Sequence, residues 1–391
     1  MPNATILYQG LLNLLDRGQW QDRRHLKTAV NMMVGLILSS SISLTGWIPY
    51  TISRALRAQS VQRRFARWLD NDRLDVHLLY TPLIQEALTA WGEATLYLAL
   101  DTTLLWDQYC MIRLSVIYRG RAVPLAWQVV EHRSAQVAFS VYRNLLQRAA
   151  KLLPSGTRKV VLLADRGFAD VALMQWCQQL GWRYRLRIKS NFRVHRSGHG
   201  SALVNQLLPK QQGKAVFLHA VSLTGEGYGP VHLALAHPPG EQDPWLIVSD
   251  ELTSLQTFEE YGLRFDIEEN FLDDKSNGFQ LEDSKLRSAA AIERLFFGIA
   301  TATLYLVVQG SEVVAPGRRR AVDPHGFRGS SYLKIGWQWL KQALNKGWQL
   351  ITCWRLRGGE DPDPAMASRR QYEASQRKFK QYKYETIAYA T

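Results

Sequence analysis

The chain has 391 residues, a formal net charge of +14 and an apolar fraction of 46%. This length allows two or three folded units with real cores, and the basic charge favours an anionic partner while saying nothing about the fold. The three cysteines are odd in number, far apart and outside any CxxC or Cys/His cluster, which argues against a zinc site and indicates reduced thiols in a cytosolic protein.

Residues 1–90 are predicted to form a helical DNA-binding domain. The most apolar stretch of this region, residues 29–50, is interrupted by serines, a threonine and a glycine. It is therefore too polar to predict a membrane span, and a buried helix pair with a turn near Thr45 and Gly46 fits better. No cleavable signal peptide is visible, and we expect no membrane partner.

A basic helix is expected from Ser60 onward. Ser60 is a good N-cap residue, and Phe65 and Trp68 follow at helical spacing. Arg63 and Arg64 fall on the opposite face. These arginines are interpreted as DNA contacts, and the alternative is a solvated basic face over a packed core.

From residue 91 the pattern changes to that of an α/β unit. Successive segments predict three strands, a helix, a strand, a helix and a last strand, over residues 95–101, 109–118, 121–131, 134–153, 159–165, 167–180 and 182–189. Three antiparallel strands that lead into α/β crossovers are the layout of a ribonuclease-H-like core. Residues 91–189 are assigned to the first part of that core.

Two aspartates end apolar runs in this unit. Asp101 follows the run at residues 97–100, and Asp165 follows the run at residues 160–164. Together with a glutamate in a helical segment, Glu268, they can hold hard cations such as Mg²⁺, which prefer oxygen ligands. On so basic a chain, nucleic acid is the polyanion on which such cations would act.

In the second half of the chain the alternation of strands and helices is interrupted and then resumes. Residues 190–250 are predicted to be a β-rich insertion, because they hold short β-like runs among glycines, prolines and histidines. Residues 251–315 are predicted to be the second part of the core, with the catalytic glutamate on a helix. Residues 316–391 are predicted to be a helical and basic C-terminal extension, with a linker at residues 358–364.

A basic stripe precedes the insertion. Arg183, Arg185 and Arg187 alternate, so they share one face of a strand, and Lys189 follows them. Like charges repel unless they face an anion. The stripe is therefore interpreted as a surface that tracks DNA phosphates, and the alternative is a solvated face.

The most specific spacing in the chain joins Tyr261, Arg264, Glu268 and Lys275. They are separated by three, four and seven positions, which would place all four on one face of a single helix. A carboxylate beside a cation and a phenol suits a surface on which Glu268 binds metal and the others hold phosphates. The neighbouring Glu269 is the alternative ligand, and the spacing selects Glu268.

Other polar residues are assigned no chemical role. Asp273 and Asp274 are expected to be helix-cap or surface acids. His195 and His199 lie four residues apart in a loop rich in serine and glycine, and they are not expected to bind metal. No Walker sequence appears.

These residues together resemble those of the DDE transposases of bacterial insertion sequences, of the insertion sequence 4 type. The resemblance is carried by Asp101 in Leu-Ala-Leu-Asp-Thr-Thr, by Asp165 in Ala-Asp-Arg-Gly-Phe and by the Tyr-Arg-Glu-Lys spacing that ends at Lys275. It covers roughly residues 95–310, and a β-rich insertion between the second and third acids is also similar to the family pattern.

The resemblance implies a metal-dependent cut-and-paste transposase. Asp101 would bridge two Mg²⁺ ions, for which Mn²⁺ can substitute, while Asp165 and Glu268 would each bind one of them. Water would first free a DNA 3′-hydroxyl at the transposon end. That hydroxyl would then attack target DNA.

The resemblance also implies partners and a location. Tyr261, Arg264 and Lys275 would position the DNA backbone near the cut, and Trp245 would stack on a flipped base. The substrates would be double-stranded DNA, as terminal inverted repeats and as target, bound by a homodimer to which the C-terminal extension is a candidate contributor. The expected location is the bacterial cytoplasm, in association with the nucleoid.

Two other functions stay open at this point. One is a ribonuclease-H-like DNA nuclease that hydrolyses DNA without strand transfer. The other is a catalytically idle DNA-binding protein derived from a transposase, against which the intact acidic triad argues. An RNA-binding protein is disfavoured because no stacked-aromatic RNA motif is present.

Overall fold

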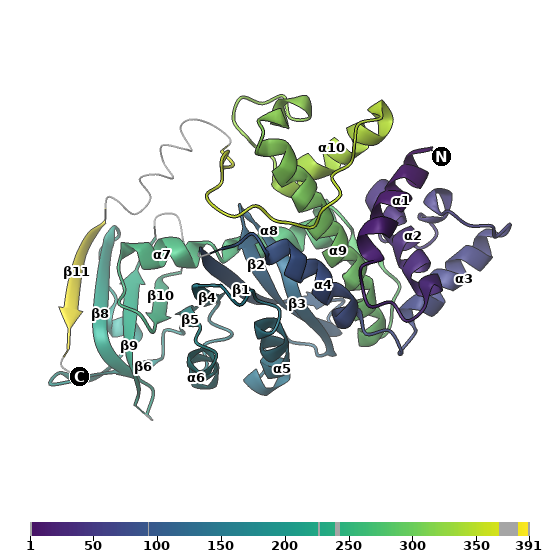
Figure 1. Ribbon diagram of the computed structural model, residues 1–391. Helices are drawn as coiled ribbons and strands as arrows, with labels where there is room; N and C mark the ends of the chain where they lie inside the picture. Colours follow the sequence, from purple (N-terminus) through teal and green to yellow (C-terminus); the bar gives the residue numbers. More distant parts are fainter. Residues whose placement is uncertain (1, 93, 226, 239–242, 367–381, 390–391) are drawn as a thin grey trace.

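The computed structural model describes residues 2–92, 94–225, 227–238, 243–366 and 382–389. Within these ranges an 11-stranded sheet runs through the molecule, with helices packed on it and gathered at one end (Figure 1). The strand order is β3-β2-β1-β4-β5-β10-β9-β8-β6-β7, and β11 pairs with β8. The prediction of a mixed α/β protein is confirmed.

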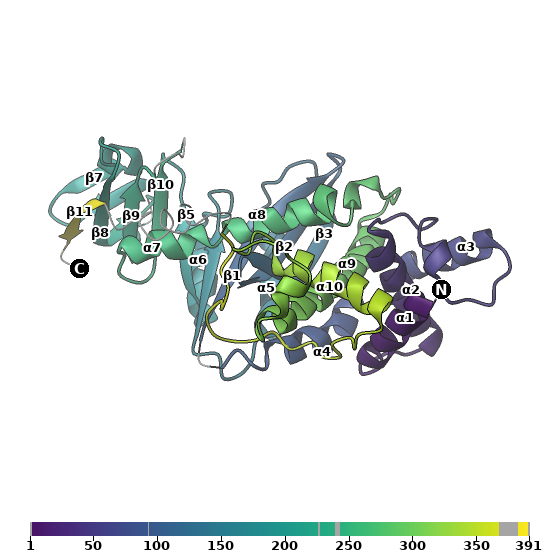
Figure 2. The same ribbon diagram turned by 90° about the horizontal axis from the view of Figure 1, so that it is seen from above.

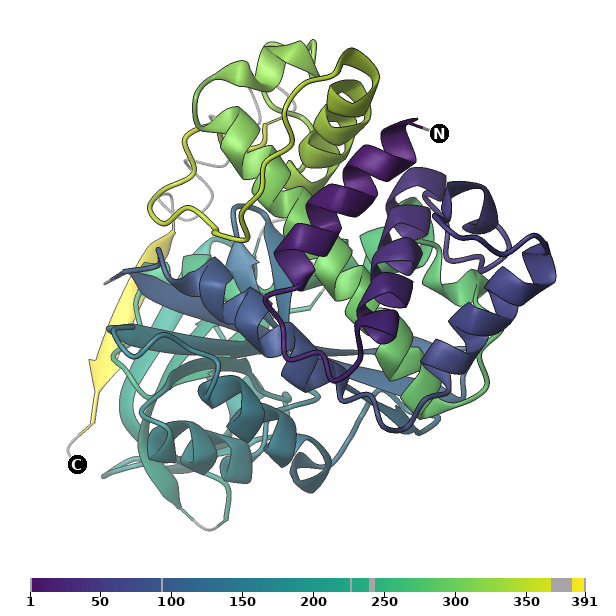
Figure 3. The same cartoon turned by 45° about the vertical axis from the view of Figure 1, so that its right-hand side comes forward.

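The N-terminal helices are α1 (Pro2–Leu15), α2 (Arg23–Ser39), α3 (Ala58–Leu69) and α4 (Val76–Leu88). α2, α3 and α4 contact α9 (Ala289–Val314), and α1 contacts α10 (Tyr332–Lys346). In Figure 3 the purple N-terminal helices accordingly lie against the green helices of the C-terminal half. α3 buries Phe65 and Trp68 and turns its arginines outward, as its amphipathic spacing predicts.

Two local predictions in this region were wrong. α3 begins at Ala58 with Arg57 as its N-cap residue, so Ser60 lies inside the first turn. Residues 29–50 are the end of one helix, a turn and a short 3₁₀ helix rather than a helix pair. The chain turns back there because buried Trp47 packs on Phe65 and its indole nitrogen donates to the Ser41 carbonyl at 2.6 Å.

One end of the sheet is an antiparallel meander, β1 (Thr95–Leu105), β2 (Tyr109–Tyr118) and β3 (Arg121–Glu131). β4 (Lys159–Ala164) lies parallel to β1, and β5 (Arg183–Arg187) lies parallel to β4. The bounds predicted for β2 and β3 are confirmed. β1 runs four residues further than predicted, because its second half stays paired with β2 as far as Leu105.

Helices cover the sheet on both sides. In the view of Figure 1, α5 (Phe139–Ala150) and α6 (Val171–Gln179) lie below it, and α7 (Leu255–Gly262) and α8 (Phe265–Leu272) lie above. Figure 2 shows α9 and α10 side by side. Among the described residues, α9 alone has the length and apolar composition to cross a membrane, but 94% of its most apolar window is buried inside the protein, which is typical of a core helix.

The β-rich segment extends the central sheet. Its strands are β6 (Arg193–Arg196), β7 (Gly200–Leu203), β8 (Lys214–Leu223), β9 (Tyr228–Ala236) and β10 (Trp245–Ser249). β10 pairs antiparallel with β5, from Ile247 opposite Arg187 to Ser249 opposite Arg185. The insertion therefore shares backbone hydrogen bonds with the core, and the domain boundaries stay a prediction.

The C-terminal region differs from its prediction in two ways. β11 (Lys383–Ala388) forms a parallel strand along β8, where only a basic extension was expected; residues 367–381 and 390–391 of that extension lie outside the described residues. The predicted linker at residues 358–364 is anchored. Asp361 binds the buried Arg328 at 2.8 Å, and Asp363 binds Arg319 at 2.6 Å.

Candidate active site

Asp101 and Asp165 lie side by side where the parallel pairing of β1 and β4 ends. β1 and β4 are parallel and in register up to the pair Leu100 and Ala164, and the two aspartates are the next residue on each strand. The run of buried apolar residues before each of them explains why the strands form there and why both polar side chains come at the same level. Asp165 directly follows β4, as the sequence predicted, whereas Asp101 lies inside β1, which continues to Leu105.

The Asp101 carboxylate is largely buried, with 13% of the side chain exposed. It accepts from the Thr102 amide at 2.8 Å and from Nη1 of Arg264 at 3.1 Å. Burial raises the pKa of Asp101 to about 6, the charge of Arg264 opposes that rise, and the charges of Asp165 and Glu268 add to it. The charges of the other two acids thus act on Asp101.

Asp165 is fixed by the turn that follows β4. Its Oδ1 accepts from the Gly167 amide at 2.8 Å. A side chain at Gly167 would bring its Cβ within 3.0 Å of the same oxygen. The adjacent Arg166 does not pair with Asp165, because Arg166 binds Asp243 at 3.1 Å.

Glu268 reaches the site through Arg264. The predicted single helix is in fact two, because α7 ends at Gly262 and α8 begins at Phe265. Arg264 lies between them, is buried, and donates from Nη2 to Oε1 of Glu268 at 2.5 Å while Nη1 binds Asp101. Glu269 instead lies 3.9 Å from Arg121. One guanidinium therefore joins Asp101 and Glu268, residues 167 positions apart in the sequence.

The carboxylate oxygens of Asp101 and Glu268 are donors that a divalent cation prefers, and in this structure the Arg264 guanidinium lies between them. Two carboxylates that converge on a guanidinium form an anionic cradle, and hard cations prefer such ligands. Within the described ranges, however, no three His, Cys, Asp or Glu side chains are gathered closely enough to hold a metal ion. In this conformation the positive charge between Asp101 and Glu268 is that of the protein itself.

Two residues of the predicted Tyr-Arg-Glu-Lys face have structural partners. Tyr261 is fully buried and packs edge-on against Trp245, with ring centroids 5.3 Å apart. Lys275 lies on a π-helical turn, donates to the Leu104 carbonyl at 2.8 Å and pairs with Glu282 at 2.9 Å. Lys275 therefore lies next to β1 but not on the helix face that carries Glu268.

The role proposed for Trp245 is not compatible with this structure. Its side chain is 1% exposed and stacks on Phe265, with centroids 5.8 Å apart and rings inclined by 29°. It also contacts Phe258. Trp245 is a core residue under α7, so it has no free face for a flipped base.

The arginines of the basic stripe on β5 pair with acidic side chains of the protein itself. Arg185 is buried and binds Glu260 and Glu251, each at 2.7 Å. Arg183 binds Asp250 at 3.0 Å. Arg187 lies 3.5 Å from Asp243 and donates to the Pro244 carbonyl. These arginines therefore need no external anion, contrary to the prediction, because acids far along the chain pair with them. Lys189, the last residue of the predicted stripe, is exposed.

Four charged residues beside the site have contacts that the sequence did not predict, Arg113, Arg121, Asp273 and Asp274. Arg113 and Asp274 form a fully buried ion pair, and Arg121 binds Asp273 at 3.0 Å. The two aspartates are each 2% exposed, so the expectation of cap or surface acids was wrong. The position of Arg113 opposite Asp101 could have been inferred from strand pairing, but its partner lies 161 residues away.

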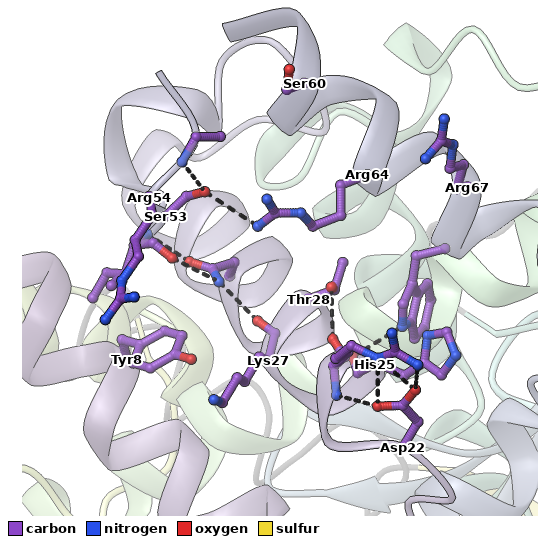
Figure 4. A pocket seen from close by; sticks show the side chains of 15 residues that line it. Tyr8, Asp22, His25, Lys27, Thr28, Ser53, Arg54, Ser60, Arg64 and Arg67 are labelled. Atoms are coloured by element: carbon purple, nitrogen blue, oxygen red, sulfur yellow. Dashed lines mark hydrogen bonds and ion pairs between the residues drawn. The ribbon is translucent and has the colours of Figure 1, made fainter. Parts of the chain in front are cut away.

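A basic groove lies among the N-terminal helices (Figure 4), and none of the three candidate carboxylates lines it. Its volume is about 970 Å³, and its charged lining is Asp22, Arg24, Lys27, Arg54, Arg64 and Arg67 with His25 beside them. Asn31 holds the Ile52 backbone at 2.7 Å, and Arg64 donates to Ser53 at 3.2 Å, which fixes the strap of residues 52–55 across α2. Of the two predicted arginines, Arg64 lines the groove and Arg63 does not.

Comparison with known proteins gives one match. A family model for the transposase DDE domain matches residues 107–305, just over half of the chain. The matched segment includes Asp165 and Glu268 and begins shortly after Asp101. No curated protein matches the chain. The family indicates an enzyme that acts on DNA and that uses divalent metal ions, as its members usually do. The chain therefore belongs to the transposase DDE domain family.

Proposed function

We propose that this protein is a transposase of the insertion sequence 4 type, which cuts DNA at transposon ends and joins the freed 3′-hydroxyl to target DNA. The observation that carries the proposal is the convergence of Asp101 and Glu268 on Arg264, with Asp165 beside Asp101 at the end of a parallel strand pair. The support for the proposal is that two acids from distant parts of the chain share one guanidinium, and that a third acid lies beside one of them where the parallel pairing ends.

The strand arrangement supports the proposal of a ribonuclease-H-like core. β1, β2 and β3 are antiparallel, and β4 and β5 continue the sheet in parallel with β1. On this interpretation residues 91–189 and 251–315 form the catalytic core and residues 190–250 are an insertion in it. The N-terminal 90 residues form a DNA-binding unit, and residues 316–391 form the extension.

Asp101, Asp165 and Glu268 would hold two divalent ions, Mg²⁺ or Mn²⁺ in its place. When bound, such ions stabilise the attacking and leaving oxygens of an in-line phosphoryl displacement. The protein's own residues do the rest. Arg264 leaves the carboxylates and binds a DNA phosphate, since a guanidinium suits phosphate as well as carboxylate. Lys275 lies beside β1, where it can bind the backbone next to the cut.

The reaction would proceed in two displacements. In the first, a water oxygen bonds to phosphorus, the bond from phosphorus to O3′ breaks, and the strand end is released as a 3′-hydroxyl. In the second, that hydroxyl attacks a phosphodiester of target DNA, whose own 3′ oxygen leaves. The carboxylates stay charged throughout. One bond to phosphorus replaces another in each step, so no external energy source is needed.

The proposed partners are double-stranded DNA, as terminal repeats and as target, and a second copy of the chain when DNA is bound. The basic groove supports DNA binding by the N-terminal unit, because its lining holds several arginines and a lysine against one aspartate. Arg64 and the exposed Arg63 are the proposed contacts on α3. The bacterial cytoplasm, at the nucleoid, is the proposed location.

A strand-transfer assay tests the proposal. The full chain is incubated with Mg²⁺, with DNA that carries the ends of its own element, and with a supercoiled target plasmid. We expect joined products, and we expect D101A, D165A and E268A each to lower their yield at least about 10³-fold, as loss of a catalytic group does. E269A is the matched control and should retain activity.

The alternatives give different results in the same assay. Cleavage without joining, even from a pre-cut end with a free 3′-hydroxyl, would identify a nuclease of the same fold. DNA binding without cleavage would identify an idle DNA-binding protein. Normal joining by E268A with loss in E269A would replace Glu268 by its neighbour in the proposed site.

A further inference from the structure

A buried ion pair lies directly beside the candidate active site. Arg113 is on β2, where it is the register partner of Asp101 on β1. Opposite residues of an antiparallel pair project from the same face of the sheet. The Arg113 side chain, none of which is exposed, therefore leaves the sheet next to the Asp101 carboxylate, and it continues toward α8.

Arg113 contacts the segment that carries Glu268 at three points. Nη1 donates to the Asp274 carboxylate on the π-helical turn after α8. Nη2 lies 3.4 Å from the carbonyl of Ile267, the residue before Glu268. The guanidinium also lies over the Phe271 ring, 4.1 Å from its centroid. One side chain thus connects the strand beside Asp101 to the helix of Glu268.

A second arginine supports the same segment. Arg121 on β3 donates from Nε to Asp273 at 3.0 Å, and Asn270 approaches Asp274 at 3.4 Å. Two arginines from neighbouring strands therefore hold two consecutive aspartates of one turn. This arrangement sets both the height and the rotation of α8 over the sheet.

Stability alone does not account for a buried ion pair. Removing two charges from water costs several kcal/mol, and a well-packed apolar pair of similar volume is often as stable or more so. What an ion pair adds is directional geometry, because a guanidinium and a carboxylate fit together in few orientations. A site whose acids come from a strand and from a separate helix needs such a connection.

We propose that Arg113 and Asp274 are positioning residues that set the separation between the carboxylates of Asp101 and Glu268. Neither touches substrate. The inference rests on the proposed function, because it assigns to these two carboxylates the binding of divalent cations. Loss of the pair would leave the fold in place and let α8 shift over the sheet.

The test compares full-length variants with Mn²⁺ alone as the probe. In R113M/D274L an apolar pair replaces the ion pair, so no unpaired charge is buried. We expect its unfolding temperature to stay within a few degrees of the parent, its Mn²⁺ affinity to fall about 10- to 100-fold, and its DNA cleavage to fall about 100-fold. R113K, which keeps the charge opposite Asp274, should recover part of both losses.

The matched control is the remote buried pair Arg328 and Asp361, which lie 2.8 Å apart. R328M/D361L should leave Mn²⁺ affinity unchanged. Should R113M/D274L fail to fold, D274N, which is isosteric, gives the same comparison. If a folded variant of the Arg113 pair keeps the parental Mn²⁺ affinity and the parental cleavage, the positioning role is wrong. If D101A binds Mn²⁺ as tightly as the parent does, the proposed function itself is wrong.

Discussion

At the scale of single residues, Arg264 gives the site its resting charge balance. Its guanidinium is bound to Asp101 at 3.1 Å and to Glu268 at 2.5 Å, and it lies over the Phe265 ring. Without it, mutually repelling carboxylates would face one another in a partly buried place. A divalent ion can also neutralise these carboxylates. A bound ion and Arg264 would therefore compete for Asp101 and Glu268.

Removal of Arg264 tests this competition. In R264A we expect the affinity of the DNA-free protein for Mn²⁺ to rise about 10-fold, which corresponds to loss of one favourable ion contact of about 1.4 kcal/mol. Cleavage of DNA should nevertheless fall, because the phosphate contact is lost. Calorimetric titration with Mn²⁺ measures the first effect. R166A is the control, since Arg166 pairs with Asp243 instead, and unchanged Mn²⁺ affinity in R264A would contradict the competition.

The pKa of Asp101 predicts how stability depends on pH in the absence of metal. Burial raises this pKa from 3.8 to about 6. Because the folded-state pKa is above the unfolded one, the contribution of Asp101 to stability is fully present below pH 3.8 and is lost as the pH rises through about 6. Between these values the folded state loses stability as the pH rises, because the carboxyl has ionised in the unfolded chain while it still holds its proton in the folded protein.

D101N removes this ionisation. With a chelator present at pH 7.5, we expect D101N to be more stable than the parent by about 1–2 kcal/mol, with the gap closing as the pH is lowered toward 4. Denaturant unfolding at several pH values measures the difference. A gap that does not change with pH would show that Asp101 ionises as freely in the folded protein as in the unfolded chain.

At the scale of elements, the parallel pairing of β1 and β4 places two acids side by side, and the turn after β4 fixes the second. Gly167 donates its amide to Asp165, and a Cβ at this position would approach Oδ1 to 3.0 Å. The turn therefore depends on a residue without a side chain. The neighbouring Asp170 caps α6 by accepting from Ala172, which keeps the turn short and ordered.

G167V should displace the Asp165 carboxylate. A contact of 3.0 Å is tighter than an ordinary van der Waals distance, so the side chain of Asp165 must rotate away. We expect cleavage to fall at least about 10-fold with a loss of stability of about 1 kcal/mol. The control is G156A, because nothing lies within 4 Å of a Cβ at Gly156. Equal cleavage by both variants would mean that the position of Asp165 is not critical.

The sequence predicted the elements whose signal is local. β2 and β3 could be bounded correctly because both are apolar runs separated by the turn at Arg119 and Gly120, which have the positive φ angles of 51° and 80° that such a turn needs. The position of Asp165 directly after β4 followed from the same signal, whereas the continuation of β1 past Asp101 did not. The break between α7 and α8 was not predicted either, although Gly262 ends α7, because the spacing of Tyr261, Arg264 and Glu268 matches one continuous helix.

Contacts between distant residues were beyond sequence analysis. The stripe that contains Arg185 was interpreted as repulsive, because Glu251 and Glu260 come more than 60 residues later. Trp245 was taken for a binding residue because composition cannot tell a buried indole from an exposed one. β11 was missed since its pairing partner, β8, lies about 170 residues earlier, and its own side chains are mostly exposed.

At the scale of the whole molecule, the basic groove and the candidate carboxylates lie on different elements. The groove is lined by α2, α3 and the strap of residues 52–55 (Figure 4), whereas Asp101 is on β1 and Glu268 is on α8. DNA long enough to reach both places would be held at two separate points. The groove would supply binding affinity, and the carboxylate site would carry out the phosphoryl transfer.

Charge reversal in the groove tests this division. K27E/R54E should lower the affinity for duplex DNA about 10- to 100-fold at moderate salt, and it should reduce the salt dependence of binding by about two phosphate contacts. Mn²⁺ affinity should not change. K151E, on an exposed lysine at the end of α5, is the control. Unaltered DNA affinity in K27E/R54E would remove the groove from the DNA path.

The strand β11 has a further consequence for handling the protein. It covers the border of β8 from Lys214 to His219, where unpaired amides and carbonyls would otherwise face solvent. An uncovered border of this kind recruits strands from other molecules. Recombinant forms truncated before Lys383 should therefore aggregate during purification, and an affinity tag should be placed at the N-terminus.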